Sequence, residues 1–386
     1  MIKNIYFIHR FHFNKSYYEN DDFQILKDMG YNVKYIDMVS LLKSSKLEDT
    51  CPLDLKKDVI YLNTKIEFNQ FLLDNKHNSI IATCVGLQNN SAWFYRIISK
   101  SDVPYIFLDV NFFPKLNSKN KIKSASTQIK RYLEKISPIY LIGKLFKSFD
   151  LYYTSRILKP AFAVLHVKSP IRKRVRKLCD QNTSFIKTNS NDWNAANREM
   201  GKPVDSNKYL VFIDQYIPYH PDYIARGINL DFTPETYYNE LNSALKCISE
   251  KTGLEVHIAA HPRRMSNDDF EFPVHYNTTS SLVKHSSLVV AHYSTAINFV
   301  AIHNKPVVFL SSDLFKKNCI STYILDMANT FGCKPINASL SSLQDETVDR
   351  LMDIDTQAYE RYFKANFNSE NSNLNSLGEI IHELVK

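Results

Sequence analysis

The chain has 386 residues, of which 44% are hydrophobic and 23% charged, the composition of an ordinary globular protein. At roughly 150 residues per domain, this length predicts two domains. Its 8 glycines are widely spaced, which excludes the glycine-rich phosphate loops of the Rossmann and Walker types. The net charge of +8 is unevenly distributed, because residues 115–177 contain 17 lysines and arginines against only Glu134 and Asp150.

The sequence does not indicate a secreted, membrane-spanning, disulfide-bonded or metal-binding protein. The opening MIKNIYFIHRFHF lacks the apolar core and cleavage site of a secretory signal, and no run of apolar residues is long enough to span a membrane. The six cysteines are scattered without a C-x-x-C pattern, which favours free thiols in a reducing cytoplasm. His257 and His261 lie along one expected strand, too far apart to share zinc. We therefore expect a cytoplasmic protein with no metal and no cofactor.

The first part of the chain alternates short apolar runs with helical stretches, which predicts a parallel α/β domain. The expected strands cover residues 5–8, 33–36, 80–85 and 105–108, and the expected helices end at Gly30 and cover residues 92–99. From about residue 112 to 178 the alternation gives way to the basic, aromatic-rich segment. We predict an N-terminal, acceptor-side domain over 1–190 with 112–178 as an insertion, and a polar linker over 183–208.

Regular alternation then resumes and predicts a second α/β domain over residues 205–345. Thr233-Pro234-Glu235 is a typical helix start, with a capping hydroxyl, a proline in the first turn and an acid near the positive helix end. The expected strands are 209–213, 256–260, 287–291 and 306–310, and the expected helices are 233–251 and 295–303. Residues 346–386 are predicted to form a C-terminal helical tail.

Ligands of parallel sheets bind at the carboxyl ends of the strands, and one such end carries His261-Pro262-Arg263-Arg264. Imidazole and guanidinium groups together suit a phosphate, because both donate hydrogen bonds and arginine is always charged. A basic surface loop without a ligand is the alternative.

Ser294 and Thr295 follow the expected strand 287–291, at the start of the next helix. Hydroxyls and free main-chain N–H groups at a helix start form an anion site that needs no glycine. The alternative is that one hydroxyl only caps its own helix. Because the His261 loop lies one β–α unit upstream, we interpret the two segments as one phosphate-binding site.

Two other strand ends carry carboxylates suited to general base catalysis. Asp214 and Gln215 follow strand 209–213, where Asp214 is a candidate base or a turn residue and Gln215 a candidate donor contact. Asp109 ends strand 105–108 in the first domain. His9 and His12 follow the first strand and compete with Asp109 for the role of base.

In their order along the chain, Asp214-Gln215, His261-Pro262 and Ser294-Thr295 resemble the C-terminal domain of GT-B glycosyltransferases. The resemblance is greatest to the bacterial sialyltransferases and polysialyltransferases, which use CMP-activated nonulosonic acids. In that group an HP motif and a serine/threonine motif hold the CMP, and an acidic motif in the first domain supplies the base. Asp109 matches the first position of that acidic motif.

The resemblance implies an α/β protein of GT-B fold, with two Rossmann-like domains facing a central cleft. It also implies an inverting, metal-independent glycosyltransferase that moves a nonulosonate from CMP to a hydroxyl of a capsule or lipopolysaccharide glycan. His261 and Arg263 would then neutralise the leaving phosphate, and Asp109 or Asp214 would be the catalytic base. The same motif spacing also resembles the CDP-polyol phosphotransferases of teichoic acid synthesis, and a UDP-sugar donor is a further alternative.

The basic segment predicts a second partner. Between residues 130 and 156, apolar positions fall on one helical face among basic residues that include Lys144 and Lys147. Such a helix favours contact with an anionic membrane, as a peripheral protein of the inner membrane acting on a lipid-linked glycan would need. A helix packed on the core with a basic outer face is the alternative. A non-catalytic binding protein is the rival class, and no nucleic-acid-binding motif is present.

Overall fold

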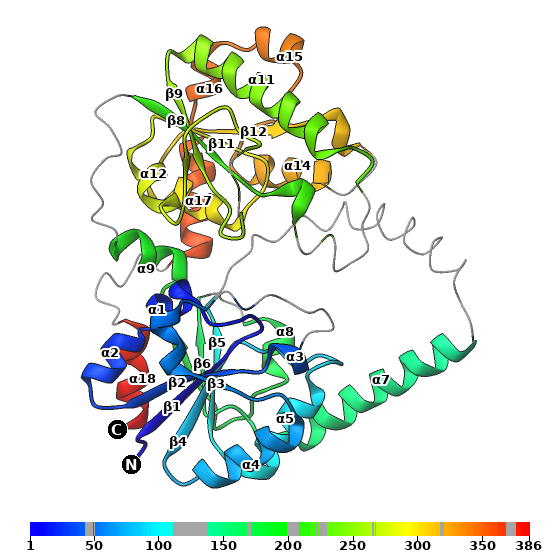
Figure 1. Cartoon of the computed structure of the whole chain (residues 1–386), viewed down its shortest axis with the longest axis vertical. Helices are drawn as coiled ribbons and strands as arrows, with labels where there is room; N and C mark the ends of the chain where they lie inside the picture. The colour runs from blue at the N-terminus through cyan, green and yellow to red at the C-terminus, as the bar shows by residue number, and fades with distance from the viewer. Residues whose placement is uncertain are drawn as a thin grey trace. The chain divides into compact units, whose positions relative to one another are not determined.

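The computed structural model describes residues 1–42, 49, 51–110, 138–167, 171–198, 208–220, 223, 230–264, 266, 268–316, 320–367 and 376–386, without the side chains of 138–145, 147, 148 and 198. The chain divides into two compact units (Figure 1). Unit 1 consists of the described parts of residues 1–112, 132–191 and 367–386, and unit 2 of those of 192–366.

Unit 1 is built on a parallel sheet, which has seven strands in the described residues. In spatial order they are β3 (Val59–Tyr61), β2 (Asn32–Asp37), β1 (Asn4–Ile8), β4 (Ser79–Thr83), β5 (Tyr105–Asp109), β6 (Ala163–His166) and β7 (Ser184–Lys187). The strand order reverses between β1 and β4, whose last residues Ile8 and Thr83 are paired. Such a reversal is where ligands bind in open parallel sheets.

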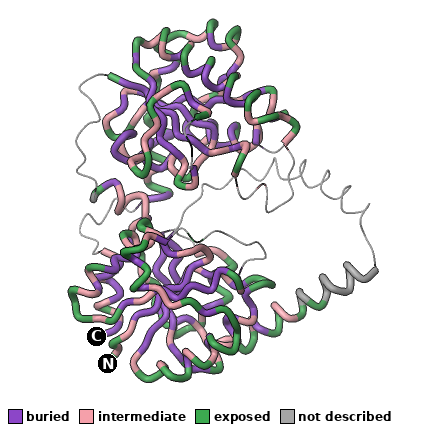
Figure 2. Tube along the Cα trace, viewed as in Figure 1, coloured by how far each residue is buried: buried purple, intermediate pink, exposed green. Residues whose placement is uncertain are grey.

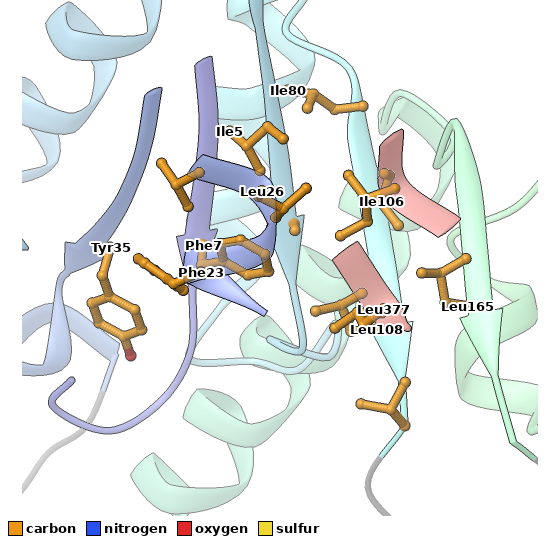
Figure 3. Close-up of a cluster of buried hydrophobic side chains, with 14 of the residues drawn as sticks. Ile5, Phe7, Phe23, Leu26, Tyr35, Ile80, Ile106, Leu108, Leu165 and Leu377 are labelled. Carbon is orange, nitrogen blue, oxygen red and sulfur yellow. The ribbon is translucent and has the colours of Figure 1, made fainter. Parts of the chain in front are cut away.

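Helices cover both faces of this sheet, and therefore its central strands are buried and apolar (Figure 2). One face packs against helices that include α2 (Phe23–Asp28), with Phe7, Phe23 and Leu26 in one cluster (Figure 3). The remaining helices of the unit are α1 (Lys15–Asn20), α3 (Val39–Leu42), η1 (Leu53–Asp58), α4 (Lys65–Asn75), α5 (Ala92–Ser101), α7 (Pro138–Ile157), α8 (Lys173–Arg176) and α18 (Leu377–Val385).

The last helix of the chain, α18, returns to unit 1 and packs beside α2 (Figure 1). A capping box at Ser376 and Glu379 starts the helix, and Leu377 belongs to the same core cluster as Leu26 (Figure 3). Gly378 allows the close approach, because a Cβ there would lie 3.0 Å from the Cβ of Asp22. Its N–H donates to the Asp22 carboxylate at 3.0 Å, which fixes the turn between α1 and α2.

Unit 2 repeats the design with a parallel sheet that has six strands in the residues described. In spatial order they are β10 (Val274–His275), β9 (Glu255–Ala259), β8 (Tyr209–Ile213), β11 (Leu288–Ala291), β12 (Val307–Ser311) and β13 (Ile336–Asn337). Here the order reverses between β8 and β11, which are paired along Leu210–Ile213 and Leu288–Ala291.

The longest helix of unit 2 in the described residues, α11 (Pro234–Thr252), begins and ends as its sequence dictates. Thr233 accepts the N–H of Thr236, Pro234 occupies the first turn, and Gly253 ends the helix at φ +67°. The other helices of the unit are α9 (Asn191–Arg198), η3 (Ile217–Tyr219), α12 (Thr279–His285), η4 (Thr295–Ile297), α13 (Asn298–Ile302), η5 (Asp313–Phe315), α14 (Ile320–Thr330), α15 (Leu340–Gln344), α16 (Val348–Met352) and α17 (Thr356–Asn366).

The strands expected from the sequence are confirmed, with bounds that shift by one or two residues. Three expectations about connections differ from the structure. The basic segment at 112–178 contains β6, which pairs with β5 and belongs to the sheet. The expected linker at 183–208 contains β7 and α9. The tail at 346–386 is helical but divided, because α16 and α17 lie in unit 2 and α18 lies in unit 1.

Candidate functional site

The predicted nucleotide-binding residues of unit 2 follow three adjacent strands. Asp214 and Gln215 come directly after β8, His261 comes two residues after β9, and Ser294 comes three residues after β11. Because the strands are parallel, their carboxyl ends meet at one edge of the sheet. These segments therefore follow neighbouring strands, with Asp214 and Ser294 on the two sides of the strand-order reversal and His261 one strand away from it.

Asp214 is a buried positioning residue in this arrangement. Its Oδ2 accepts from Arg264 Nε at 2.7 Å, and both side chains are 0% exposed. Oδ2 also accepts from the N–H of His261 at 3.3 Å, and Oδ1 accepts from the N–H of Tyr216 at 2.7 Å. Its oxygens hold the loops after β8 and β9 together, as expected of the turn residue that is the alternative to a base at this position.

Arg264 is held in place by a ring of polar and aromatic side chains. It also donates to Asp269 at 2.7 Å and to the hydroxyl of Tyr238, and its guanidinium lies 4.6–4.7 Å from the ring centroids of Phe270 and Tyr216. Burial opposes its charge, but the hydrogen bond and the charge of Asp214 outweigh that effect, so the pKa of Arg264 is raised. Arg264 is thus a permanent cation inside the loop.

His261 is a neutral imidazole whose tautomer is set by its own loop. Burial is the main cause that lowers its pKa to about 4, and the charges of His220, Arg263 and Arg264 act in the same direction, against the opposing charge of Asp214. Its Nδ1 accepts the N–H of Arg263 at 3.2 Å, so the neutral ring carries its proton on Nε2. At neutral pH His261 therefore donates a hydrogen bond and carries no charge, unlike the cation that the sequence suggested.

The loop after β11 is tied to the loop after β8. Gln215 Oε1 accepts the N–H of Tyr293 at 2.7 Å, which makes Gln215 a bridge across the point of strand-order reversal. Ser294 accepts the N–H of Ala296 at 3.2 Å and caps η4, the alternative considered for it. Thr295 is exposed at the first position of η4 and presents its side chain to solvent.

His292 completes the support beneath this loop. Its Nδ1–H donates to the carbonyl of Leu310 at 2.7 Å, and its Nε2 accepts from the Tyr237 hydroxyl at 2.9 Å. The ring is 2% exposed, and burial lowers its pKa to about 4. His292 therefore joins β11, β12 and α11 as a neutral structural group.

In unit 1, the expected base Asp109 is buried in an ion pair. Its carboxylate accepts from Arg172 Nε at 3.0 Å and also contacts the terminal nitrogen of the same guanidinium. Burial and the nearby charge of Arg174 lower the pKa of Arg172 to about 10, which leaves it charged at neutral pH. Asp109 would have to leave this cation before it could accept a proton from a substrate.

His12 and His9, the competing candidates, each pair with a carboxylate. His12 Nδ1 lies 2.8 Å from Asp37 Oδ2, with the two side chains 16% and 4% exposed. Asp37 is oriented in turn, because its Oδ1 accepts the N–H of Val39 at 3.1 Å. His9 is buried at 4% exposure and contacts Asp21. The His12–Asp37 pair therefore has both the orientation and the access that a general base needs.

Lys144 and Lys147 lie in α7, but their side chains are outside the described part of the structure. The described remainder of α7 bears exposed apolar side chains, with Phe146 at 71%, Phe149 at 67% and Tyr153 at 52%. Its inner side is fixed to α5, since Arg96 donates to Asp150 at 2.5 Å and to Thr154 at 2.8 Å. The contact with α5 agrees with the alternative of a helix packed on the core, and the exposed apolar side chains lie on the remainder of the helix.

Sequence reasoning missed several partners that decide these roles. Asp37 and Asp21 were not singled out, although each lies near a histidine that was. Arg264 was read as a second loop arginine, whereas it is the buried partner of Asp214. Of these three residues, only Asp37 could have been found from the sequence. It ends β2, the strand beside β1, and therefore lies at the same sheet edge as His12.

Two absences concern the described residues alone. No group of three metal-ligating side chains comes together there. No helix among them is long and apolar enough to cross a bilayer. A cavity of about 380 Å³ in unit 2 is lined by Val307, Gly332, Arg350 and Asp355, and it lies by the start of β12, away from the carboxyl edge.

No protein-family model matches the sequence, and no curated protein matches it. Solved structures share its fold. The glycotransferase of kitacinnamycin is 9% identical with a TM-score of 0.50 over 100% of both chains. The wall teichoic acid polymerase TagF, as its H444N variant with CDPG, is 12% identical with a TM-score of 0.51 over 99% of this chain and 88% of that one. A proposed UDP-N-acetylglucosamine 2-epimerase from Listeria monocytogenes is 10% identical with a TM-score of 0.51 over 100% and 96%.

These low identities establish the fold and nothing finer. The chain has two parallel-sheet units with flanking helices, as GT-B glycosyltransferase structures do. The expected α/β fold of GT-B type is confirmed.

Proposed function

We propose that this chain is a glycosyltransferase that uses a nucleotide-activated sugar, with unit 2 binding the nucleotide and unit 1 supplying the base. The observation that carries the proposal is the loop after β9. It holds a neutral His261, with its proton on Nε2, next to Arg263, at the end of the strand beside β8, and the strand order of unit 2 reverses on the other side of β8. A hydrogen-bond donor and a cation side by side suit a phosphate ester.

Each residue of this loop has a distinct part in the proposal. Arg263 supplies the charge that stabilises the leaving phosphate, and His261 donates from Nε2 to a phosphate oxygen. Pro262 turns the chain so that both groups follow the strand directly. Thr295 offers a hydroxyl to the nucleotide, while Gln215 and Ser294 hold the loop after β11 in place.

His12 is the proposed general base. With Nδ1–H donating to Asp37, the ring takes the proton of the acceptor hydroxyl on Nε2. The acceptor oxygen bonds to the anomeric carbon as the bond from that carbon to the phosphate oxygen breaks, which inverts the configuration. Arg263 and His261 then balance the charge that develops on the departing nucleotide.

We propose a CMP-activated nonulosonate as donor, and the support is the resemblance carried by Asp214-Gln215, His261-Pro262 and Ser294-Thr295. The proposed acceptor is a hydroxyl of a bacterial capsule or lipopolysaccharide glycan. The exposed aromatic side chains of α7, within the basic segment, support a peripheral contact with an anionic membrane that carries this glycan.

A CDP-polyol phosphotransferase is the second candidate. The same spacing of the His261-Pro262 and Ser294-Thr295 segments supports it, and TagF is among the chains of similar fold. The two reactions break different bonds. A glycosyltransferase breaks the bond between the sugar carbon and the phosphate of CMP. A polyol phosphotransferase breaks the diphosphate of the CDP-polyol, transfers the polyol phosphate and releases CMP.

Thermal denaturation of the full chain with CMP, CDP, UDP and GDP tests the proposal. We expect CMP to raise the melting temperature most, and a larger shift with CDP or UDP would favour the corresponding alternative donor. Arg263→Ala should weaken binding by about 10–100-fold and His261→Ala by about tenfold, because a hydrogen bond from a charged group is stronger than one from a neutral group. Lys246→Ala, an exposed cation of the same unit, is the matched control. If no nucleotide shifts the melting temperature, the proposal fails.

A further inference from the structure

The carboxyl edge of unit 1 holds a second cluster, which the proposed transfer reaction does not use. Cys84 follows β4 and His9 follows β1, the two strands between which the order of the sheet reverses. The strand ends are locked together, since Thr83 Oγ1 donates to the carbonyl of Ile8 at 2.8 Å. Cys84 Sγ and His9 Nδ1 lie 2.8 Å apart, within hydrogen-bond reach.

The far side of the imidazole is held by a carboxylate. His9 Nε2 lies 2.6 Å from Asp21 Oδ2, and the two side chains are 4% and 2% exposed. Asp21 caps the end of α1, where its own N–H donates to Tyr17 and Glu19. The next residue, Asp22, is tied to α18 through the N–H of Gly378. The carboxylate therefore has a fixed position, and the imidazole is oriented toward the thiol.

Aromatic rings enclose the imidazole and keep water from it. Tyr17 stacks on His9 with ring centroids 4.5 Å apart and planes 8° apart, and Tyr35 stacks at 5.7 Å. Burial opposes a charge on His9, but the charges of Asp21 and Cys84 outweigh it, so its pKa is raised well above 6.5. A protonated imidazole beside sulfur stabilises the thiolate form.

Two of the other half-buried thiols among the described residues have different partners. Cys179 donates to the carbonyl of Val175 at 3.3 Å, and Cys333 donates to that of Ala328 at 3.6 Å. Burial raises the pKa of each to about 11, which keeps both protonated at neutral pH. Both provide matched references within the same chain, because their accessibility resembles that of Cys84.

We propose that Cys84, His9 and Asp21 form a reactive-thiol centre at which Cys84 is oxidised by hydrogen peroxide to a sulfenic acid. A nucleophile within reach of an imidazole that a third group orients is the arrangement that activates a thiol. The thiolate attacks one peroxide oxygen, an S–O bond forms and the O–O bond breaks. Sulfur loses two electrons, and the departing hydroxide takes the Nδ1 proton of His9 and leaves as water.

The test treats the full-length chain with hydrogen peroxide at neutral pH in the presence of dimedone, which traps sulfenic acids, followed by mass mapping of the cysteine peptides. We expect Cys84 to be labelled at least about tenfold faster than Cys179 and Cys333, because the thiolate is the reacting form. Cys84→Ser must remove that adduct. Labelling of Cys84 at or below the rate of the two reference thiols overturns the proposal without any variant.

Two substitutions test the role of the imidazole. His9→Gln keeps a hydrogen-bonding side chain of similar size but cannot carry a proton charge, and we expect Cys84 to fall to the rate of Cys179. Asp21→Asn should lower the rate by a smaller factor, because the ring keeps its place and loses only its counter-charge. Circular dichroism checks that each variant is folded, and an unchanged Cys84 rate in a folded His9→Gln chain overturns the proposal.

Discussion

Both units place histidines at the carboxyl edge of a parallel sheet, yet they surround them with opposite charges. In unit 2, His261 lies beside Arg263 and Arg264, and its pKa falls to about 4. In unit 1, His9 and His12 each lie within 2.8 Å of a carboxylate, and the pKa of His9 rises. The position after a parallel strand therefore does not determine what a histidine does.

The difference follows from burial together with the charges around each ring. In unit 2 burial keeps His261 neutral, and the charges of Arg263 and Arg264 act in the same direction against that of Asp214. In unit 1 the buried carboxylates of Asp21 and Asp37 contact His9 and His12, and for His9 the charges of Asp21 and Cys84 outweigh burial and raise its pKa. One edge is suited to holding an anion and the other to accepting a proton, which matches the two halves of the proposed reaction.

The largest effect is expected from the base of unit 1. His12→Ala should lower turnover by about 10²–10⁴-fold, the usual contribution of general base catalysis, and should leave nucleotide affinity unchanged. Asp37→Asn should lower turnover by a smaller factor, because the ring loses the group that orients it. Steady-state release of the nucleotide, with binding measured separately, checks both.

Asp109→Asn distinguishes His12 as the base from Asp109, the base that the sequence resemblance implies. With Asp109 paired to Arg172, we expect this variant to retain most of the wild-type turnover. Loss of turnover in Asp109→Asn together with a nearly normal His12→Ala would return the role of base to Asp109.

The next effect concerns the buried charges of unit 2. Asp214→Ala removes the buried carboxylate that pairs with Arg264 and leaves this cation only the partly exposed Asp269, so we expect the free energy of unfolding to fall by about 3–5 kcal/mol. Glu360→Ala removes an ion pair with Lys364 that is 62–74% exposed in the same unit, and should cost less than about 1 kcal/mol. Urea denaturation of both variants gives the comparison. Equal costs would show that Asp214 is not the positioning residue described above.

The fold and the grouping of the site could be predicted from sequence because both rest on local patterns. Apolar runs of four or five residues gave strands, and residues after parallel strands must meet at one edge. This rule groups His261 with Ser294, and the family resemblance adds Asp214 to them. The shortest strands, β10 and β13, are two residues long and leave no such pattern.

The pairing of charges could not be predicted, because it depends on contacts between distant segments. Nothing in His261-Pro262-Arg263-Arg264 shows which arginine turns inward. The turn that returns Arg264 to Asp214 is closed by its N–H donating to the carbonyl of His261 at 2.9 Å. Likewise, the return of α18 to unit 1 depends on a close approach at Gly378, a contact across more than 350 residues.

The smallest expected effect is on how the stability of the fold depends on pH. It tests most directly whether histidines are kept neutral in unit 2 and protonated at His9 in unit 1. His292 has a pKa of about 4 in the folded chain against 6.5 when unfolded, so the unfolded chain binds the extra proton between those values. Unit 2 should therefore lose stability as the pH falls from 6.5 toward 4. For His9 the sign is reversed, because a raised pKa stabilises the fold below pH 6.5 and this contribution is lost as the pH rises through the folded value.

The His292→Gln variant separates the contribution of this one histidine to the pH dependence of stability from that of all other groups. Between pH 6 and pH 5 the wild-type chain should lose about 1 kcal/mol more stability than the variant, since one proton changes stability by about 1.4 kcal/mol per pH unit. Urea unfolding of both chains at the two pH values measures the difference, and contributions shared by both, such as that of Asp192, cancel. A wild-type slope equal to that of His292→Gln would mean that this ring is not held neutral, and the contrast between the two edges would then rest on His261 alone.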